Sequence, residues 1–359
     1  GPVTLPLRRA YNHIEEKISS HLKGFAPKSD EHLEEVLRLK KVFLEQLKVL
    51  KLVTNDLSDS LDVFMTMNNR GTPLGVFDLF RGEILKARLE SSPQDARDAL
   101  FLDSIEEWNQ IMEYLGGYSA DKYLRHFALT KNYEKLKDAE KDTEVLKVKP
   151  LTLKALPKWT TDYLLGKQDP GFAAENLWDE AVQKSNDYGY MLNPKNGDFS
   201  DYYLEGLKLM GDSYRVLLLG VDFLDTSVWA KADRERLLRL TFSLFLKWSL
   251  ASKNAQQLEG VFQALSAEFN EDMSCSNLLS ELSSRGSFDF DFEKRLTAEL
   301  DSSVAKAIML ILEAHLSPLA VKVNLSEVQL EHIAPQTSTP SWRSAIGDDN
   351  EYDQKIQML

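Results

Sequence analysis

Cysteine is nearly absent from this sequence, since Cys275 is the only one in 359 residues. A single thiol can form neither an internal disulfide nor a thiolate zinc cluster, and this composition fits a reducing compartment. Long apolar runs are also absent, because no stretch approaches the ~20 residues that a membrane-spanning helix needs. The start of the sequence lacks the basic and then apolar pattern of a secretory signal. These absences predict a cytoplasmic protein without a membrane partner.

Basic residues are outnumbered by acidic ones, with 43 Lys and Arg against 56 Asp and Glu and a formal net charge of -13. This balance argues against a generic DNA-coating protein, whose affinity would come from neutralising phosphates. It leaves room for a nuclease, which needs only local basic patches and a metal ion. The apolar share of 43% and charged share of 28% are those of an ordinary globular protein.

Helical periodicity dominates the rest of the sequence, because apolar residues recur every three or four positions. We expect Ser29 or Asp30 to cap a helix through Leu50, and we expect the stretch from Tyr214 to Leu224 to be a fully buried helix. A long helix is predicted from about Phe292 to His315. Further helices are expected over residues 105–115, 237–248 and 258–269.

Strand signals are few and lie near the end of the sequence, over residues 320–323 and 328–333. The charged stretch from Glu134 to Lys149 reads as a solvated helix or a linker between two helical subdomains. The predicted fold is therefore mainly α, a multi-helix body followed by a short β element. The expected domains span residues 3–135, 136–318 and 319–359.

A first cluster of candidate site residues lies between Asn68 and Asp78. Gly71, Thr72 and Pro73 are explained by a helix end followed by the cap and first position of a new helix. That explanation leaves the neighbouring Asn68, Asn69 and Arg70 unaccounted for. An arginine can grip a phosphate with two hydrogen bonds, and a helix start adds free N–H groups. The cluster predicts a phosphate site, with Asp78 placed where it could approach a bound metal.

A second cluster is the pair Glu331 and His332, on the predicted strand from Val328 to Ile333. Neighbouring strand side chains point to opposite faces, so the two groups can act from different angles. A histidine that is neutral near pH 7 can take a proton from an attacking water, and a metal can neutralise charge that develops on a phosphate. The pair is compatible with phosphodiester hydrolysis, and the alternative from the residues alone is a surface histidine beside an exposed glutamate.

Both clusters resemble motifs of the GmrSD-type modification-dependent restriction nucleases, whose N-terminal region is related to ParB and sulfiredoxin folds. The run from Phe64 to Leu85 is similar to the family segment F-x-x-x-N-x-R-G-x-x-L-x-x-x-D-L. The residues from Val328 to Gln336, with Trp342 beyond them, resemble the opening of the family's HNH, or His-Me finger, nuclease domain. The residues that match the first segment are Asn68 or Asn69, Arg70, Gly71, Leu74 and Asp78.

The resemblance implies a role for each cluster. It makes His332 the general base and Glu331 a ligand of Mg²⁺ or another divalent metal. It makes Asn68, Asn69, Arg70 and Asp78 part of a nucleoside triphosphate site. The implied activity is nucleotide-regulated cleavage of modified, foreign phage DNA, with a homo-oligomer or a defence-system protein as possible further partners.

The sequence departs from the family pattern at two places. No D-G-Q-Q-R motif, which forms the other half of the family's nucleotide site, occurs in it. The sequence also stops at Leu359, where the family pattern continues toward an asparagine and a last metal ligand. We therefore expect this chain alone, a fragment of the nuclease, not to cut DNA.

Two other functions fit the same residues. The helical body could be a non-catalytic sensor or assembly module of a defence complex, with the chemistry elsewhere. The chain could also be a ParB-like nucleotide switch with a vestigial C-terminal region.

The missing half of the nucleotide site generates a first prediction. Calorimetric titration of this chain with a nucleoside triphosphate and Mg²⁺ should show weak binding or none, because Asn68, Asn69 and Arg70 would act without their partners. Micromolar affinity would contradict this expectation.

Overall fold

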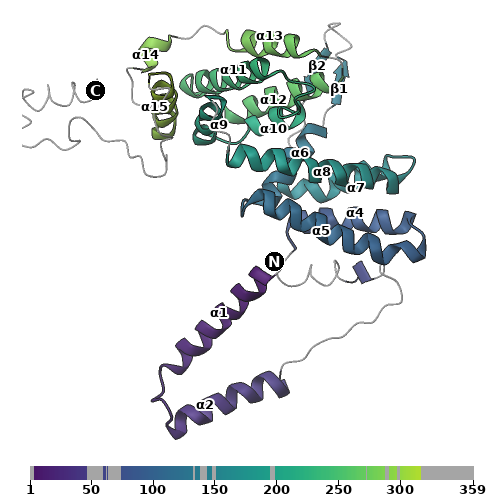
Figure 1. Cartoon of the computed structure of the whole chain (residues 1–359), viewed down its shortest axis with the longest axis vertical. Helices are drawn as coiled ribbons and strands as arrows, with labels where there is room; N and C mark the ends of the chain where they lie inside the picture. The colour runs from purple at the N-terminus through teal and green to yellow at the C-terminus, as the bar shows by residue number, and fades with distance from the viewer. Residues whose placement is uncertain are drawn as a thin grey trace, which may run out of the picture. The chain divides into compact units, whose positions relative to one another are not determined.

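The computed structural model describes residues 4–46, 60, 61, 63, 74–131, 134–137, 144–147, 151–194, 199–271, 273–287, 291–296 and 300–316. This part of the chain is mainly α-helical, as predicted (Figure 1). In chain order the helices are α1 (Thr4–Leu22), α2 (Asp30–Lys41), the π-helix η1 (Val42–Gln46), α4 (Val76–Ser91), the 3₁₀ turn η2 (Gln94–Ala96), α5 (Arg97–Leu115), α6 (Ala120–Lys131), the 3₁₀ turn η3 (Leu153–Ala155), α7 (Leu156–Leu165), α8 (Pro170–Leu192), α9 (Phe199–Met210), α10 (Tyr214–Gly220), α11 (Lys231–Leu250), α12 (Ala255–Glu271), α13 (Cys275–Arg285), α14 (Phe292–Leu296) and α15 (Ser302–Leu316). None of these helices combines the length and apolar character needed to cross a membrane.

The chain forms two compact units. Unit 1 comprises Gly1–Glu113 and Thr161–Trp178, and unit 2 comprises Tyr114–Thr160 and Asp179–Leu359. The division runs through α5, α7 and α8, each of which contributes residues to both units. The sequence-based domain ranges stay a prediction, and the third of them, residues 319–359, lies outside the described residues.

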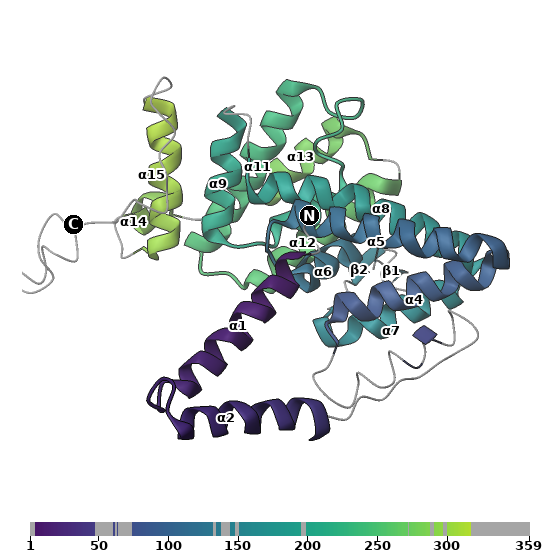
Figure 2. The same ribbon diagram turned by 60° about the horizontal axis from the view of Figure 1, so that its bottom comes forward.

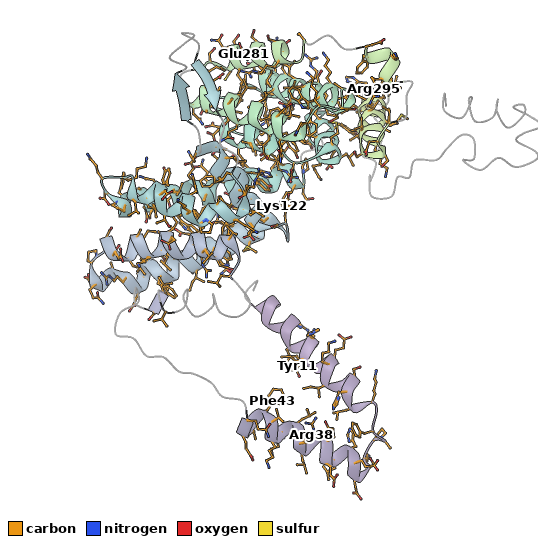
Figure 3. The ribbon with its side chains drawn as sticks, turned by 180° about the vertical axis from the view of Figure 1, so that it is seen from behind. Tyr11, Arg38, Phe43, Lys122, Glu281 and Arg295 are labelled. Atoms are coloured by element: carbon orange, nitrogen blue, oxygen red, sulfur yellow. The ribbon has the colours of Figure 1, made fainter. Side chains whose placement is uncertain are left out.

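Within unit 1, helices α1 and α2 form a helical hairpin with little buried apolar surface. Nε2 of His21 lies 2.7 Å from a carboxylate oxygen of Glu35, and Glu35 also accepts two hydrogen bonds from Arg38. No residue of α2 is buried. Tyr11 and Phe43 carry exposed aromatic rings (Figure 3). This hairpin therefore depends on polar contacts rather than on a core of its own.

The core of unit 1 is formed by aromatic side chains from α4, α5 and the first part of α8. The Phe77 and Trp108 rings lie 4.7 Å apart between centroids, and Phe80 lies 6.1 Å from Trp178. Arg88 is buried beside them, where its guanidinium pairs with both Glu175 and Glu107. A buried charge is costly unless it is paired, so these two carboxylates make the burial of Arg88 possible.

Unit 2 is organised around α10, whose residues are all buried, as the apolar run in the sequence predicted. The helix ends at Gly220, earlier than expected, and Asp222 in the following turn has a left-handed φ of 51°. Helix α10 packs against α6 and α12. Helix α9 lies between α15 and α11 and packs against both (Figure 2). A seven-residue helix surrounded in this way derives its stability from tertiary packing.

The charged stretch after α6 differs from the prediction of a solvated helix or linker. It forms an antiparallel hairpin of β1 (Glu134–Lys137) and β2 (Glu144–Lys147), in which Glu134 pairs with Lys147 and Lys137 with Glu144. The hairpin lies inside unit 2. The C-terminal strands predicted over 320–323 and 328–333 lie outside the described residues.

Side-chain caps set several helix boundaries. Oγ of Ser29 accepts a hydrogen bond from the His32 amide at the start of α2, which confirms the predicted cap. The single long helix expected from Phe292 to His315 is wrong. Asp301 caps a separate helix, α15, because its carboxylate accepts from the amide and hydroxyl of Ser303. The expected helices over 105–115, 237–248 and 258–269 lie within α5, α11 and α12.

The close approach of α10 and α12 generates a prediction for two glycines. A Cβ on Gly220 would lie 1.6 Å from Oγ of Ser266, whereas a Cβ on Gly260 of α12 would have open space. We expect Gly220→Ala to destabilise the protein by about 1–3 kcal/mol through overpacking. Gly260→Ala should raise stability by up to about 1 kcal/mol, because alanine favours a helix. Urea unfolding would measure both, and equal shifts of the same sign would contradict the packing described.

Candidate functional site

Most of the site residues predicted from sequence lie outside the described residues, namely Asn68, Asn69, Arg70, Glu331 and His332. Asp78 is described, and it lies half-buried in the first turn of α4. Its charge acts on Arg81, whose guanidinium stacks on the Trp108 ring at 4.5 Å. Burial lowers the pKa of Arg81, and the nearby carboxylate of Asp78 opposes that shift. The structure therefore places one member of the proposed phosphate site beside a cation.

A buried polar cluster of unit 2 lies around Arg215 of α10. Its Nη1 donates to the phenol oxygens of Tyr118, at 2.7 Å, and Tyr188, at 3.2 Å. Its Cζ lies 5.0–5.5 Å from the ring centroids of Tyr118, Tyr188 and Tyr214. Each such cation–π contact is worth roughly 0.5–2 kcal/mol, more when water is excluded. Three aromatic rings thus stabilise a guanidinium that is only 4% exposed.

His126 of α6 extends this network. Its Nδ1 lies 2.8 Å from the hydroxyl of Tyr188, and the two rings stack with centroids 5.9 Å apart. Since Arg215 can only donate, the Tyr188 oxygen accepts a hydrogen bond from it. The Tyr188 hydroxyl can then donate its own hydrogen to Nδ1 of His126. The network favours an imidazole that carries its hydrogen on Nε2. Burial lowers the pKa of His126 to about 3, so the ring is neutral at physiological pH.

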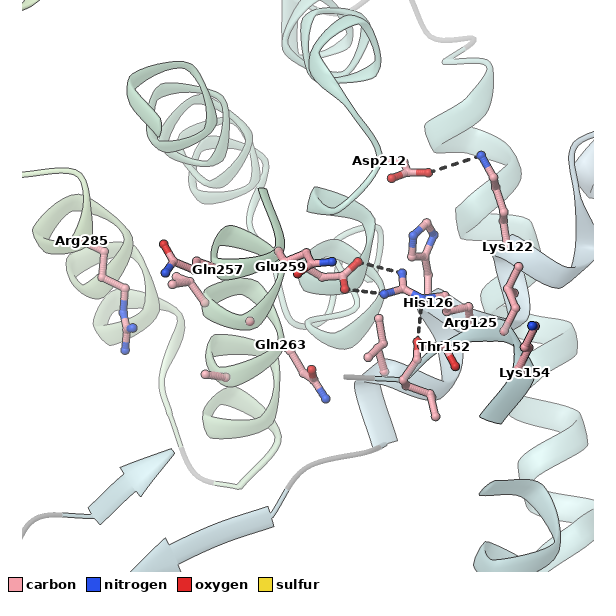
Figure 4. Close-up of a pocket in the computed structure, with 17 residues that line it drawn as sticks. Lys122, Arg125, His126, Thr152, Lys154, Asp212, Gln257, Glu259, Gln263 and Arg285 are labelled. Carbon is pink, nitrogen blue, oxygen red and sulfur yellow. Dashed lines mark hydrogen bonds and ion pairs between the residues drawn. The ribbon is translucent and has the colours of Figure 1, made fainter. Parts of the chain in front are cut away.

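An ion pair between Arg125 and Glu259 forms one wall of a cavity next to this network (Figure 4). The guanidinium binds both carboxylate oxygens, at 2.8 and 2.5 Å, and its Nε donates to the Leu151 carbonyl at 2.7 Å. This two-pronged geometry is among the stronger protein ion pairs. Arg125 therefore fixes three segments relative to one another: α6, α12 and the chain that enters η3.

The cavity has a volume of about 880 Å³ and lies entirely within unit 2. Its buried floor combines apolar side chains with His126 and Gln263, while its rim carries exposed Lys122, Lys154 and two glutamines of α12. Four cationic side chains line it, against two carboxylates. The cationic residues are Lys122, Arg125, Lys154 and Arg285, and the anionic ones are Asp212 and Glu259. The lining is thus net positive in a chain whose formal charge is -13.

The chemistry available at this cavity is that of binding. A neutral, buried histidine and a glutamine offer hydrogen-bonding groups, and the rim offers positive charge. Within the described ranges no group of three or more His, Cys, Asp or Glu side chains could hold a metal ion. A large concave site with a few convergent polar groups is the usual form of a small-molecule site.

Sequence reasoning did not identify this cavity. Tyr123, Arg125, His126 and Phe127 lie on α6, and the side chain of His126 is buried there. The partners of these residues are remote, because Glu259 lies 134 positions after Arg125 and Tyr188 lies 62 positions after His126. No local motif joins such residues, so periodicity could not reveal that they meet.

Comparison of the chain with protein-family models, with curated proteins and with solved structures finds no match.

The buried imidazole generates a prediction about acid stability. Because its folded pKa, about 3, is below the usual 6.5, the unfolded state binds a proton more readily between these values. The contribution of neutral His126 is therefore complete above pH 6.5 and is lost as pH falls toward 3, by at most about 1.4 kcal/mol per pH unit.

His126→Asn keeps an acceptor for the Tyr188 hydroxyl but cannot titrate. Urea unfolding between neutral pH and about pH 4 should show a shallower loss of stability in this variant than in the parent chain. Parallel curves would show that His126 does not account for the loss.

Proposed function

We propose that the chain is part of a nucleotide-regulated, metal-dependent DNA endonuclease that restricts modified foreign DNA in the cytoplasm. The observation that carries this proposal is the order of two motifs in one sequence. Asn68, Asn69, Arg70 and Asp78 come first, a long helical region follows, and Glu331 with His332 come last. Two motifs in a fixed order are more specific than either alone. The helical character of the described region between them is compatible with this arrangement.

In this proposal His332 accepts a proton from the water that attacks the phosphodiester, and Glu331 is a ligand of a divalent metal ion. The ion, when bound, would neutralise charge on the phosphate and on the leaving oxygen. Arg70 and the asparagines beside it contact the phosphates of a nucleoside triphosphate. Asp78 supports this proposal through its position in the first turn of α4, the helix that follows those residues.

One observation favours a second candidate, a non-catalytic sensor or assembly module. The helical body contains a large, net-positive cavity that neither motif explains. Binding of a ligand there would regulate a separate catalytic partner. In that case the C-terminal Glu331 and His332 would have no role in DNA cleavage.

Two substitutions in the full-length protein test these alternatives. His332→Ala should reduce cleavage of modified DNA by about 100-fold or more, because it removes the general base, and should leave nucleotide hydrolysis intact. Arg70→Ala should impair the response to nucleotide. Cleavage that is unchanged by His332→Ala would reject the nuclease assignment and favour the sensor. An unaltered nucleotide response in Arg70→Ala would remove that residue from the proposed nucleotide site.

A further inference from the structure

The cavity of unit 2 has two chemically different zones. Its floor is water-poor, since Leu129, Leu151, His126 and Gln263 are each 5% exposed or less. Its rim is open and basic, with Lys154 and Lys122 both exposed. Figure 4 shows Glu259 and Gln263 on one side of this space and Arg125 and His126 on the other. A ligand that fills both zones needs an apolar body with a hydrogen-bonding edge and an anionic end.

We propose that this cavity binds a nucleotide unit as its monophosphate, with the base on the floor and the phosphate at the rim. The proposal goes beyond the proposed nuclease activity and concerns different residues from the Asn68–Asp78 motif. In this arrangement the base lies against Leu129 and Leu151, where His126 and Gln263 face its polar edge. Lys154 faces the phosphate.

The polar groups of the floor select the kind of body that fits there. A glutamine carboxamide presents a donor and an acceptor side by side, which is the pairing that a nucleobase edge offers in return. A wholly apolar ligand would offer no hydrogen-bonding group to this polar part of the floor. Inorganic phosphate alone would leave the apolar floor uncovered.

Charge selects the number of phosphates. Three of the four cationic side chains of the lining face a carboxylate, because Arg125 pairs with Glu259, Lys122 lies 4.0 Å from Asp212 and Nε of Arg285 lies 3.6 Å from Glu281. Among the side chains that line the cavity, the remaining cation is Lys154. A monophosphate, with a charge of about -1.5 to -2 at neutral pH, suits this one lysine better than a longer phosphate chain does. A triphosphate would add further negative charge beside Glu259 and Asp212.

The nucleotide unit that binds in the cavity could come from two sources, which are a free nucleotide and a nucleotide turned out of a DNA strand. Proteins that handle a single base can take it out of the helical stack into a pocket. The volume of about 880 Å³ lies within the range of roughly 300–1,000 Å³ found for small-molecule sites. The lining contains no cluster of acids suited to a metal, so binding should not depend on Mg²⁺.

The experiment is a binding titration of this chain, in the presence of EDTA, with the four deoxynucleoside monophosphates, the matching nucleosides and a single-stranded oligonucleotide. We expect saturable binding of at least one monophosphate, with the matching nucleoside about ten-fold weaker because it lacks the phosphate. If only the oligonucleotide binds, and binding depends on the cavity, the source is a base from a strand. Absence of saturable binding by every probe would overturn the proposal.

Two matched pairs of variants locate the binding. Gly260 lines the cavity and a Cβ there meets open space, so Gly260→Leu should fill the cavity and abolish binding, whereas Gly260→Ala should retain it. Lys154→Glu should weaken binding about ten-fold, because it repels the phosphate. Lys158→Glu makes the same change at an exposed lysine that does not line the cavity, and it should have little effect.

The test of monophosphate binding is independent of the test of the proposed nuclease activity. Arg70→Ala alters the sequence motif and not the cavity, so it should leave monophosphate binding unchanged. Binding that survives Gly260→Leu and Lys154→Glu, or that disappears in Arg70→Ala, would overturn the cavity proposal. Neither result depends on DNA cleavage, which His332→Ala tests independently.

Discussion

The buried guanidinium of Arg215 is the constraint on which the described part of unit 2 depends. A cation in a helix that is buried on every side must be stabilised where it lies, and Arg215 meets phenol oxygens and aromatic faces. Tyr188 contacts both Arg215 and His126, and His126, which burial keeps neutral, belongs to the floor of the cavity. The hydrogen-bonding character of the cavity is therefore set by a charge outside it.

The helices could be predicted from the sequence because their signals are local. Apolar spacing located α5, α11 and α12, and the Ser29 hydroxyl marked the start of α2. The failures arose where a competing local signal or a remote partner decided the outcome. Asp301 divided an apolar run that otherwise read as one helix. In the charged stretch, Glu134 and Lys147 are thirteen positions apart in the sequence and are partners in the ladder of β1 and β2.

The candidate site shows the same difference between local and remote information. Glu331 with His332, and Arg70 with its neighbours, form motifs because each set is contiguous, and those motifs carry the proposed nuclease activity. The cavity has no contiguous signature, since Arg125 and Glu259 meet only after α6 and α12 pack around α10. The two kinds of information together describe a chain with motifs near both ends and a basic, partly apolar cavity in unit 2. If both proposals hold, a free nucleotide or a base from a DNA strand that binds in the cavity can influence DNA cleavage.

The most direct measurement of the central claim, that the Arg215 network shapes a nucleotide-sized cavity, is a crystal structure of this chain grown with a deoxynucleoside monophosphate. The account predicts density for the base beside His126 and Gln263, with the phosphate at Lys154 and the Arg125–Glu259 pair intact. A cavity filled by the chain's own side chains, or a nucleotide bound only elsewhere, would contradict it.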